Sequence, residues 1–322
     1  MDPTLAANFM GSAAAGVIAR ICTHPLDTAK ARLQAVGSGA SAYRGPWDVL
    51  VRTAQTEGLQ GLYRGFGAVI VGGTPGTVLY LCSYEIAKEK LAQAIQRTND
   101  RGTASDFAVH FASGMIAEAV ACIIYVPVDV VKERLQVQHA ANNAMDGYYS
   151  SSLHALKTIS HTEGLLSLYK GYGATLLSFG TYSGLFFLFY ERLLDQTRVY
   201  LERTSPSFSE GQRAVPFHWT VICSCTAGAA ASWLTSPLDM AKLRLQVQRG
   251  QSAGAMAKGT NTITTIGYRG VAECLAHAYR NGGIAGLFRG AGARVLHFAP
   301  ATTVTMTAYE TCRLFFAGLL QQ

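Results

Sequence analysis

The feature that most constrains this chain is a ten-residue segment that occurs three times, with the copies roughly 100 residues apart. Each copy reads Pro-x-Asp-x-x-Lys-x-Arg-Leu-Gln, and the copies begin at Pro25, Pro127 and Pro237. Two further blocks follow each copy: an aromatic-base-Gly element that closes residues 57–65, 163–171 and 282–290, and a Tyr-Glu pair at 84–85, 190–191 and 309–310. Three blocks in one order, three times over, indicate a tandem triplicate with repeats over 1–100, 101–203 and 204–322.

Each repeat contains two long apolar stretches, joined by a shorter segment that is polar on one face. This organisation predicts six candidate membrane spans, each near the ~20 residues that cross a bilayer, and three short surface helices. The composition, 49% hydrophobic and 15% charged residues, excludes a disordered chain. The mean hydropathy is only +0.17, because charged and hydroxyl residues interrupt the spans. Such spans fit a bundle with one face toward lipid and the other toward a wet cavity.

The net charge of +7 suits an anionic partner, which can be nucleic acid, an anionic membrane surface or an anionic solute. No nucleic-acid-binding module is visible, so we interpret the basic residues as contacts to lipid headgroups. The seven cysteines lack metal-ligand spacing and are expected to be reduced thiols. The first ten residues lack the basic region of a cleavable signal. No constellation of catalytic side chains and no metal cluster is present, so the sequence predicts neither an enzyme nor a metal site.

The triplicate motif resembles the signature of the mitochondrial carrier family, and the resemblance covers essentially the whole chain. It implies an all-α, six-helix membrane bundle with threefold pseudosymmetry, kinked odd-numbered helices and three short matrix-side surface helices. It also implies solute transport by alternating access in the mitochondrial inner membrane, although plastid and peroxisomal members exist. One chain already closes the threefold ring, so a functional monomer is expected.

In that arrangement the acid of each Pro-x-Asp segment can meet the lysine of another repeat, and the prolines are expected to kink the helices. The expected pairs form a matrix gate: Asp27–Lys132, Asp129–Lys242 and Asp239–Lys30. The family resemblance suggests that three glutamines one turn further on brace these pairs: Gln34, Gln136 and Gln246. The alternative is three unrelated surface ion pairs worth about 0–1 kcal/mol each; the shared register favours the gate.

The Tyr-Glu block predicts a second gate at the cytosolic mouth. The acids Glu85, Glu191 and Glu310 face only two bases, Lys88 and Arg313, because Leu194 occupies the third basic position. By the family pattern Glu85 therefore lacks its partner, unless Arg198 substitutes. We expect a weaker cytosolic gate than matrix gate, and a resting state that is open to the cytosol.

The aromatic-base-Gly block opens the second span of each repeat, where helix N-terminal amide groups attract anions. A lipid phosphate is the natural guest, and the family resemblance implies bound cardiolipin; the alternative is a plain tight turn between helices. The residues of this predicted lipid site are Arg64, Gly65, Lys170, Gly171, Arg289 and Gly290. The third copy departs from the others, with Asn281-Gly282 where they have an acid before glycine.

The family resemblance places solute contacts at a fixed offset before each Tyr-Glu pair, at Gly72, at Ser178 with its neighbour Phe179, and at His297. None of these is Lys or Arg, which disfavours a polycarboxylate or a nucleotide. Three charged residues also reach the expected cavity: Arg20, Glu118 and Arg294. Arg20 and Glu118 either clamp a zwitterion or pair with each other. His297 is either a metal ligand or a core residue.

Two local likenesses bear on the solute. Residues 117–136 are similar to the third helix of S-adenosylmethionine carriers, and residues 293–310 to the sixth helix of carriers for iron or other cofactors. Together with the uncharged contact positions, they favour a zwitterionic or cationic solute over a polyanion. A second class of function stays open, a membrane scaffold or regulatory protein on the same fold that no longer transports. A soluble helical-repeat scaffold conflicts with the lipid-length spans.

Overall fold

The computed structural model describes residues 3–35, 43–97, 103–138, 149–204, 215–248, 267–296 and 311, and every regular element within them is helical. The first repeat holds α1 (Pro3–Ala35), α2 (Pro46–Leu62) and α3 (Phe66–Arg97). The second holds α4 (Thr103–Val137), α5 (Ser152–Thr162), the 3-10 helix η2 (Leu165–Tyr169) and α6 (Tyr172–Thr204). The third holds α7 (Phe217–Leu234), α8 (Ser236–Val247) and α9 (Val271–Leu287), followed by helical turns at 291–296.

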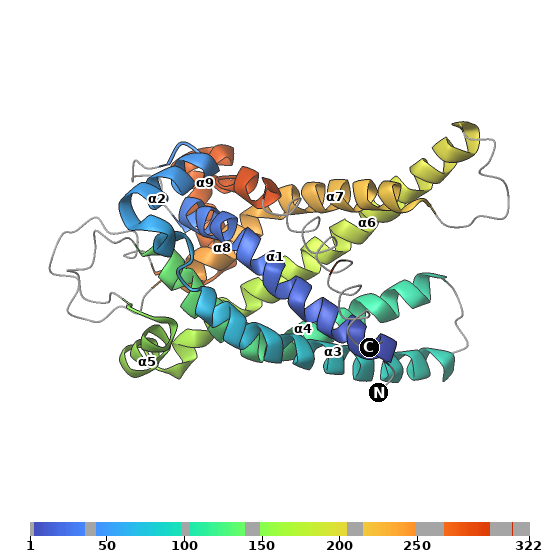
Figure 1. Ribbon diagram of the computed structural model, residues 1–322, viewed down its shortest axis with the longest axis horizontal. Coiled ribbons are helices and arrows are strands. Elements are labelled where there is room, and N and C mark those ends of the chain that lie inside the picture. The colour runs from blue at the N-terminus through green and yellow to red at the C-terminus, as the bar shows by residue number, and fades with distance from the viewer. Residues whose placement is uncertain are drawn as a thin grey trace.

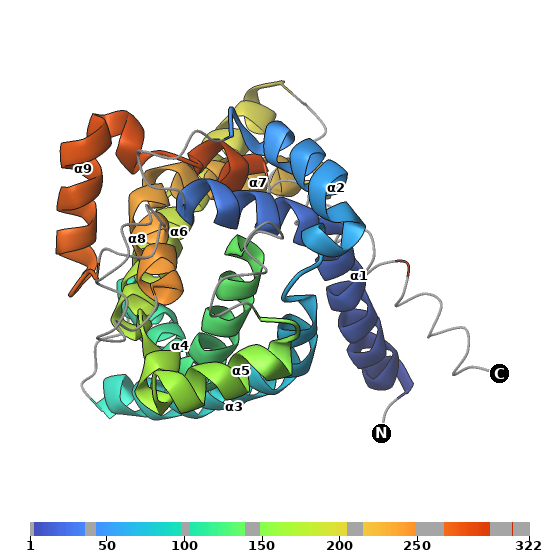
Figure 2. The ribbon, with the colours of Figure 1, turned by 90° about the vertical axis from the view of Figure 1, so that its left-hand side faces the viewer.

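The long helices run lengthwise through the molecule, and the short helices α2, α5 and α9 gather at one end (Figure 1). Seen from that end, α2, α5 and α9 lie around the ends of α1, α4 and α8 (Figure 2). Along the bundle α3 packs against α4, and α6 packs against α7. The ends of α1, α4 and α8, one from each repeat, therefore meet at the centre of one end of the bundle.

Two of the described helices are apolar enough over a sufficient length to cross a membrane, within Phe66–Ala94 and Ala108–Val137. A third span results if the bent pair His218–Leu234 and Ser236–Val247 is taken as one. The helices α1 and α6 are 33 residues long, ample for a bilayer, and their Gly, Ser and Thr residues lower the hydropathy. The last span expected from the sequence is described only as far as residue 296.

The prolines act differently in the three repeats. The helical run continues through Pro25 in α1 and Pro127 in α4. In the third repeat the helix breaks at Thr235, just before Pro237, and α7 and α8 are bent by 60°. The kink expected at every proline is therefore an outright break in the third repeat alone.

The difference follows from what happens to the carbonyl that each proline deprives of its helical donor. The carbonyl of Ile21 accepts a hydrogen bond from the Tyr63 hydroxyl at 3.0 Å. That of Ile123 accepts one from the Tyr169 hydroxyl at 3.1 Å. The third repeat has Phe288 at the equivalent position, which has no hydroxyl to donate. Its ring instead packs on Trp233, with the ring centres 4.8 Å apart.

Small buried residues let the helix ends approach one another at the gathered end. Ala31 and Ala35 of α1 form a buried cluster with Leu243 and Val247 of α8. Because alanine has the smallest side chain that still favours a helix, the two backbones can come close enough for polar side chains to bridge them. This packing positions the site described next.

A ring of ion pairs as the candidate transport gate

Three ion pairs join α1, α4 and α8 at the centre of the gathered helix ends. Lys132 Nζ lies 2.6 Å from Asp27 Oδ2, Lys242 Nζ lies 2.8 Å from Asp129 Oδ2, and Lys30 Nζ lies 2.6 Å from Asp239 Oδ2. These are the three pairings predicted from the sequence. We call the six side chains the ion-pair ring. Every pair joins two different repeats, so the ring holds the three repeats together.

A second cyclic set of bonds, which the sequence analysis did not predict, reinforces the first. Each Pro-x-Asp segment carries an arginine two residues after its lysine, and the arginine Nε donates to a main-chain oxygen of another repeat. The bonds are Arg32 to Gln136 O at 2.9 Å, Arg134 to Gln246 O at 3.2 Å and Arg244 to Gln34 O at 3.1 Å. The sequence feature that could have drawn attention to these bonds is the recurrence of this arginine in all three copies of the motif.

Two of these arginines also tie the ring to the surface helices. Arg32 donates to both carboxylate oxygens of Glu57, at 2.7 and 3.0 Å. Arg134 contacts both oxygens of Glu163, one of them at 3.1 Å. Both arginine side chains are only 1% exposed, and bidentate bonds between a guanidinium group and a carboxylate are of the strong, charge-assisted kind. The acid of the Glu-Gly block therefore fixes the surface helix to the ring in the first two repeats.

The third repeat lacks that acid, because Gly282 stands in its place. Arg244 instead hydrogen-bonds Tyr268 and Cys274, the latter on α9. Burial raises the pKa of the Cys274 thiol to about 11, an effect that the positive charge of Arg244 partly offsets. Burial likewise raises the pKa of Tyr268. The third surface helix is thus held by neutral groups in place of a carboxylate.

The three glutamines do not act alike. Gln34 Nε2 reaches Asp239 Oδ2 at 3.5 Å, so it does contact a carboxylate of the ring. Gln136 Nε2 instead donates to Thr28 Oγ1 at 3.2 Å and lies 3.4 Å from His24 Nε2. The Gln246 side chain has no hydrogen-bond partner in the part of the chain that the structure describes. The expectation that all three brace the ion pairs is therefore wrong for Gln136 and Gln246.

Two further charged side chains adjoin the ring. Glu133, which the sequence analysis did not single out, lies with Oε1 3.6 Å from Lys132 Nζ. Arg294, predicted as a solute contact, lies with Nε 3.7 Å from Asp239 Oδ2 and over the ring of Tyr182 at 5.7 Å. One of its guanidinium nitrogens, Nη1, is buried without a hydrogen-bond partner among the described residues.

The predicted cytosolic gate lies at the opposite end and is described only in part. Glu85 and Glu191 are exposed, and neither forms an ion pair with a described residue. Lys88 Nζ lies 5.9 Å above the ring of Tyr84. Arg198, the suggested substitute partner of Glu85, lies 3.5 Å from Asp195. Glu310 and Arg313 lie outside the described residues.

Not all of the predicted solute contacts face open space. A side-chain carbon on Gly72 would come within 2.1 Å of Val128, so Gly72 serves close packing of α3 on α4. Ser178 is buried at 5% exposure and Phe179 is half-buried. His297 lies outside the described residues.

The two charged residues proposed as a clamp are separate in the structure. Arg20 is exposed, lies against α3 near Gly73 and makes no ion pair with any residue described. Glu118 is buried and accepts a hydrogen bond from the Cys122 thiol at 3.6 Å. The alternative that Arg20 and Glu118 simply neutralise each other is therefore not what the structure shows. Tyr125, which lies 3.1 Å from the Thr77 hydroxyl, adds a polar group to the same wall.

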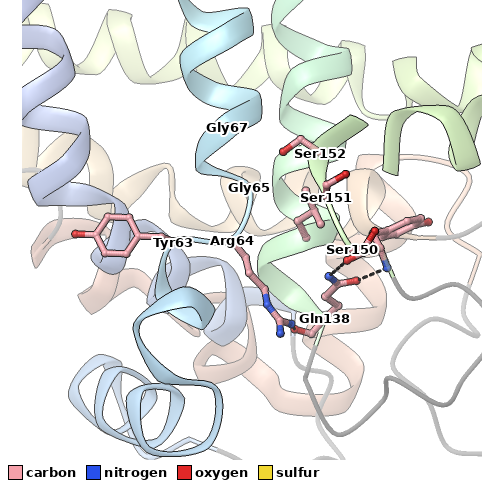
Figure 3. A pocket seen from close by; sticks show the side chains of 10 residues that line it. Tyr63, Arg64, Gly65, Gly67, Gln138, Ser150, Ser151 and Ser152 are labelled. Atoms are coloured by element: carbon pink, nitrogen blue, oxygen red, sulfur yellow. Dashed lines mark hydrogen bonds between the residues drawn. The ribbon is translucent and has the colours of Figure 1, made fainter. Parts of the chain in front are cut away.

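Two of the six residues of the predicted lipid site, Arg64 and Gly65, line a pocket of about 280 Å³ between the first two repeats (Figure 3). Tyr63, Arg64 and Gly65 form one side of it, and Gln138 with the serines 150–152 forms the other. Arg64 Nη1 lies 3.2 Å from Glu57 and donates to the main-chain oxygen of Gln138 at 3.2 Å. Arg64 and the serine hydroxyls are the hydrogen-bond donors that line the pocket, because the side-chain amide of Gln138 is bonded to the Tyr149 main chain.

The glycines of this block have a packing role as well. Gly65, Gly171 and Gly290 all have φ between 81° and 84°, a left-handed conformation that other residues rarely adopt. A side-chain carbon would come within 3.0 Å of the Lys132 main-chain oxygen at Gly65, and within 2.8 Å of Gln34 at Gly290. Lys170 lies 3.1 Å from Glu163. Arg289 forms no ion pair with a residue that the structure describes.

A triplicate helical chain whose repeats are joined in a ring by inter-repeat ion pairs defines a class of membrane carrier. The family model described as mitochondrial carrier protein matches residues 2–94, 103–198 and 213–319, and the chain belongs to the mitochondrial carrier family. Its fold is thus the six-helix membrane bundle of that family, its function is solute transport, and its location is the mitochondrial inner membrane.

Similar proteins span nearly the whole chain. Mitochondrial substrate carrier family protein E of Dictyostelium discoideum is 31% identical over 96% of this chain and 95% of its own length. Mitochondrial citrate transporter C of Aspergillus niger is 32% identical over 98% and 91%. The succinate/fumarate mitochondrial transporter of Saccharomyces cerevisiae is 31% identical over 96% and 90%. All three are similar in length to this chain, and their names describe carriers or transporters.

Proposed function

We propose that this chain moves a small zwitterionic or cationic metabolite or cofactor by alternating access between a matrix gate and a cytosolic gate. The observation that carries the proposal is the ion-pair ring, which joins all three repeats at one end of the bundle. The lysines and aspartates are each between 13% and 28% exposed, so water can reach the pairs. Partly hydrated ion pairs are weak enough to break and re-form, as a gate requires.

The exposed acids at the opposite end of the bundle support a resting state that is open to the cytosol. Glu85 and Glu191 are exposed, and Leu194 supplies no charge to the predicted cytosolic gate. A conformation with a closed matrix ring and exposed acids at the far end is one open to the cytosol. On this basis Leu194→Lys should strengthen the cytosolic gate and raise the share of the state open to the matrix. An unchanged balance between the two states would contradict this part of the proposal.

The proposed solute class follows from the charges available along the predicted cavity wall. Two of the relatives are named for carboxylates, citrate and succinate with fumarate. In this chain Gly72 offers no side chain and Ser178 offers only a hydroxyl, whereas Glu118 places a carboxyl in the membrane-spanning part of α4. A polyanion would be repelled by Glu118. A zwitterion can present its cationic group to Glu118 and its anionic group to Arg20.

Reconstitution tests the proposal directly. Cardiolipin-containing liposomes bearing the purified chain would be offered radiolabelled S-adenosylmethionine, amino acids, carboxylates, nucleotides and divalent metals, with and without internal counter-solute. We expect saturable uptake of a zwitterion or cation, accelerated by internal counter-solute if the carrier is an antiporter. Glu118→Gln should lower this uptake at least tenfold, about 1.4 kcal/mol of binding. The exposed carboxyl variant Glu202→Gln is the matched control.

The outcomes separate the alternatives. Preferential uptake of a carboxylate that does not depend on Glu118 would overturn the solute class and keep the carrier. No uptake of any solute by folded protein would favour the non-transporting scaffold. Because the three pairs close the ring within one chain, we also propose that the transporting unit is a monomer, and inactivity of single chains isolated in nanodiscs would contradict this.

We further propose that the pocket of Figure 3 binds the phosphate of an anionic lipid, cardiolipin in the mitochondrial inner membrane. The Arg64 guanidinium, the serine hydroxyls that line the pocket and the start of α3 directly after Gly65 support it. Cardiolipin should raise the unfolding temperature of the purified protein, and Arg64→Gln should reduce that rise. The matched control is Arg52→Gln on the exposed face of α2. An equal rise in both variants would remove the pocket from the lipid proposal.

A further inference from the structure

A fourth acid enters the neighbourhood of the ion-pair ring from the second repeat alone. Glu133 lies between Lys132 and Arg134, and the equivalent positions in the other repeats are Ala31 and Leu243. It is one helical turn beyond Asp129 on α4, and so on the side of the ring toward the end of that helix. This end of the bundle is the one surrounded by the surface helices (Figure 2).

The Glu133 carboxyl has few polar partners among the described residues. Its side chain is 14% exposed, and Oε1 lies 3.6 Å from Lys132 Nζ. That lysine lies 2.6 Å from Asp27 and is thus already engaged. The second oxygen, Oε2, is buried and has no hydrogen-bond partner among the residues described. A carboxylate normally accepts several hydrogen bonds when it is buried, and this one lacks them.

The charges that face Glu133 come from all three helices of the ring. They are Asp27 and Lys30 on α1, Asp129 and Lys132 on α4, and Lys242 on α8. Each of the three lysines lies within 2.8 Å of an aspartate, so the six charges of the ring balance without Glu133. The further cation beside the ring, Arg294, adjoins Asp239 at 3.7 Å and is not among the charges that face Glu133. Glu133 is therefore a surplus acid, and an additional negative charge there would be buried without a cation of its own.

We propose that Glu133 is a proton-binding site of the matrix gate. Its carboxylate takes up one proton from matrix water when the ring closes, and the carboxylic acid returns that proton to matrix water when the ring opens. Closure removes water from the carboxyl, and the bound proton removes the charge that burial penalises. A lower matrix pH therefore favours the closed ring. The proposal rests on the proposed function in one respect only, namely that the ring opens.

The first test needs neither a solute nor transport. Thermal unfolding of the full chain with cardiolipin would be followed from about pH 5.5 to about pH 8.5 for the wild type and Glu133→Gln, a neutral mimic of the protonated group. Because the mimic carries no charge to bury, we expect it to unfold at a higher temperature than the wild type at the alkaline end, by at least about 3 °C. The difference should shrink as the pH falls. Glu202→Gln, at an exposed acid, is the control without such a trend.

Two results would overturn the proton site. If Glu133→Gln unfolds at a lower temperature than the wild type at alkaline pH and the gap closes in acid, Glu133 is an ionised partner of Lys132. A difference that does not change with pH would mean that Glu133 does not titrate in this range. Glu133→Leu, which installs the residue of the third repeat, serves as the second variant if the glutamine protein folds poorly.

The second test asks whether the proton is coupled to the gate. Ala31 is the first-repeat counterpart of Glu133, is 1% exposed and packs against α8, so opening of the ring should expose it. The labelling rate of Ala31→Cys with a water-soluble maleimide would be compared with and without Glu133→Gln, resolved by mass spectrometry. The rate with Glu133 present is divided by the rate with glutamine at that position, which cancels the pH dependence of the thiol itself. We expect this ratio to rise at least about threefold from the acid to the alkaline end of the pH range.

A constant ratio alongside a positive unfolding result would retain the proton site and overturn its coupling to the gate. Failure of every solute in the uptake assay would overturn the proposed transport, while these two measurements would still decide the role of Glu133.

Discussion

The hydroxyl of Tyr63 donates to the main-chain oxygen of Ile21 at 3.0 Å. This oxygen belongs to the residue four positions before Pro25, and so has lost its helical donor. The tyrosine comes from the aromatic-base-Gly block, and the proline from the Pro-x-Asp block. In the first two repeats, two motifs that are far apart along the chain are thus connected by one hydrogen bond, which repairs the defect that the proline creates.

Tyr63→Phe should therefore lower the stability of the protein by about 1 kcal/mol, because a main-chain acceptor loses its donor. The unfolding temperature in cardiolipin-containing micelles measures the effect. Tyr279→Phe, on an exposed tyrosine of α9, is the matched control and should be neutral. Equal effects of the two substitutions would show that the hydroxyl of Tyr63 contributes nothing beyond its surface polarity.

The ion-pair ring could be predicted from the sequence because three copies of one motif leave a small set of partners once threefold symmetry is assumed. The arginine bonds could not, because their acceptors are main-chain oxygens that have no signature in the sequence. The role of the glutamines was wrong for a local reason. Gln136 faces Thr28 and His24 of the first repeat, and these hydroxyl and imidazole groups bind its amide before a carboxylate can.

The same comparison of repeats explains the unpartnered amide of Gln246. The positions equivalent to Thr28 and His24 in the second repeat are Val130 and Val126, which offer no hydrogen-bonding group. Similarly, the sequence analysis did not predict that the missing side chain of Gly72 allows close packing on Val128. Aligning the repeats position by position would have revealed the first difference. The second depends on a helix-to-helix distance that the sequence does not encode.

Val130→Thr should give Gln246 the partner that Thr28 gives Gln136. Thr28 also donates to the main-chain oxygen of Leu62 at 2.8 Å, and Leu168 is the equivalent residue beside Val130. We expect a gain of about 1 kcal/mol in stability, because two buried polar groups become satisfied at nearly constant volume. Val131→Thr buries a hydroxyl away from Gln246 and should be destabilising. A fall in unfolding temperature for both variants would refute the pairing.

Gly290→Ala should be strongly destabilising, by about 2 kcal/mol or more. The residue has φ 84°, and a side-chain carbon would lie 2.8 Å from Gln34 of the first repeat. Gly292→Ala is the matched control two residues further on, where nothing lies within 4 Å. Thermal unfolding of both variants gives the comparison, and similar unfolding temperatures would mean that the third and first repeats are not in close contact at this point.

Cys274 should be almost inert to alkylation in the folded protein. Burial raises the pKa of its thiol from 9.0 to about 11, so the reactive thiolate at pH 8 falls from about one molecule in ten to about one in a thousand. Because the raised pKa belongs to the folded state, reactivity should appear as the pH approaches 11 or on unfolding. Arg244→Gln removes the positive charge that offsets the burial and should suppress labelling further. Mass spectrometry after iodoacetamide treatment measures it, and rapid labelling at pH 8 would contradict the buried contact with Arg244.

The strictest test of the ring is a charge exchange between two repeats. Asp27→Lys leaves Lys132 beside a like charge, and should lower stability by up to about 3 kcal/mol, since the pair is largely but not wholly buried. Adding Lys132→Asp restores an ion pair of reversed polarity, and should recover more than half of the loss. Uptake should follow the same order, because a ring that cannot close cannot hold solute on one side.

Asp48→Lys with Arg52→Asp, an exposed pair within α2, is the control exchange. If the double variant in the ring were no better than Asp27→Lys alone, the lysine and aspartate would be near neighbours that do not depend on each other, and the ring would not be the gate.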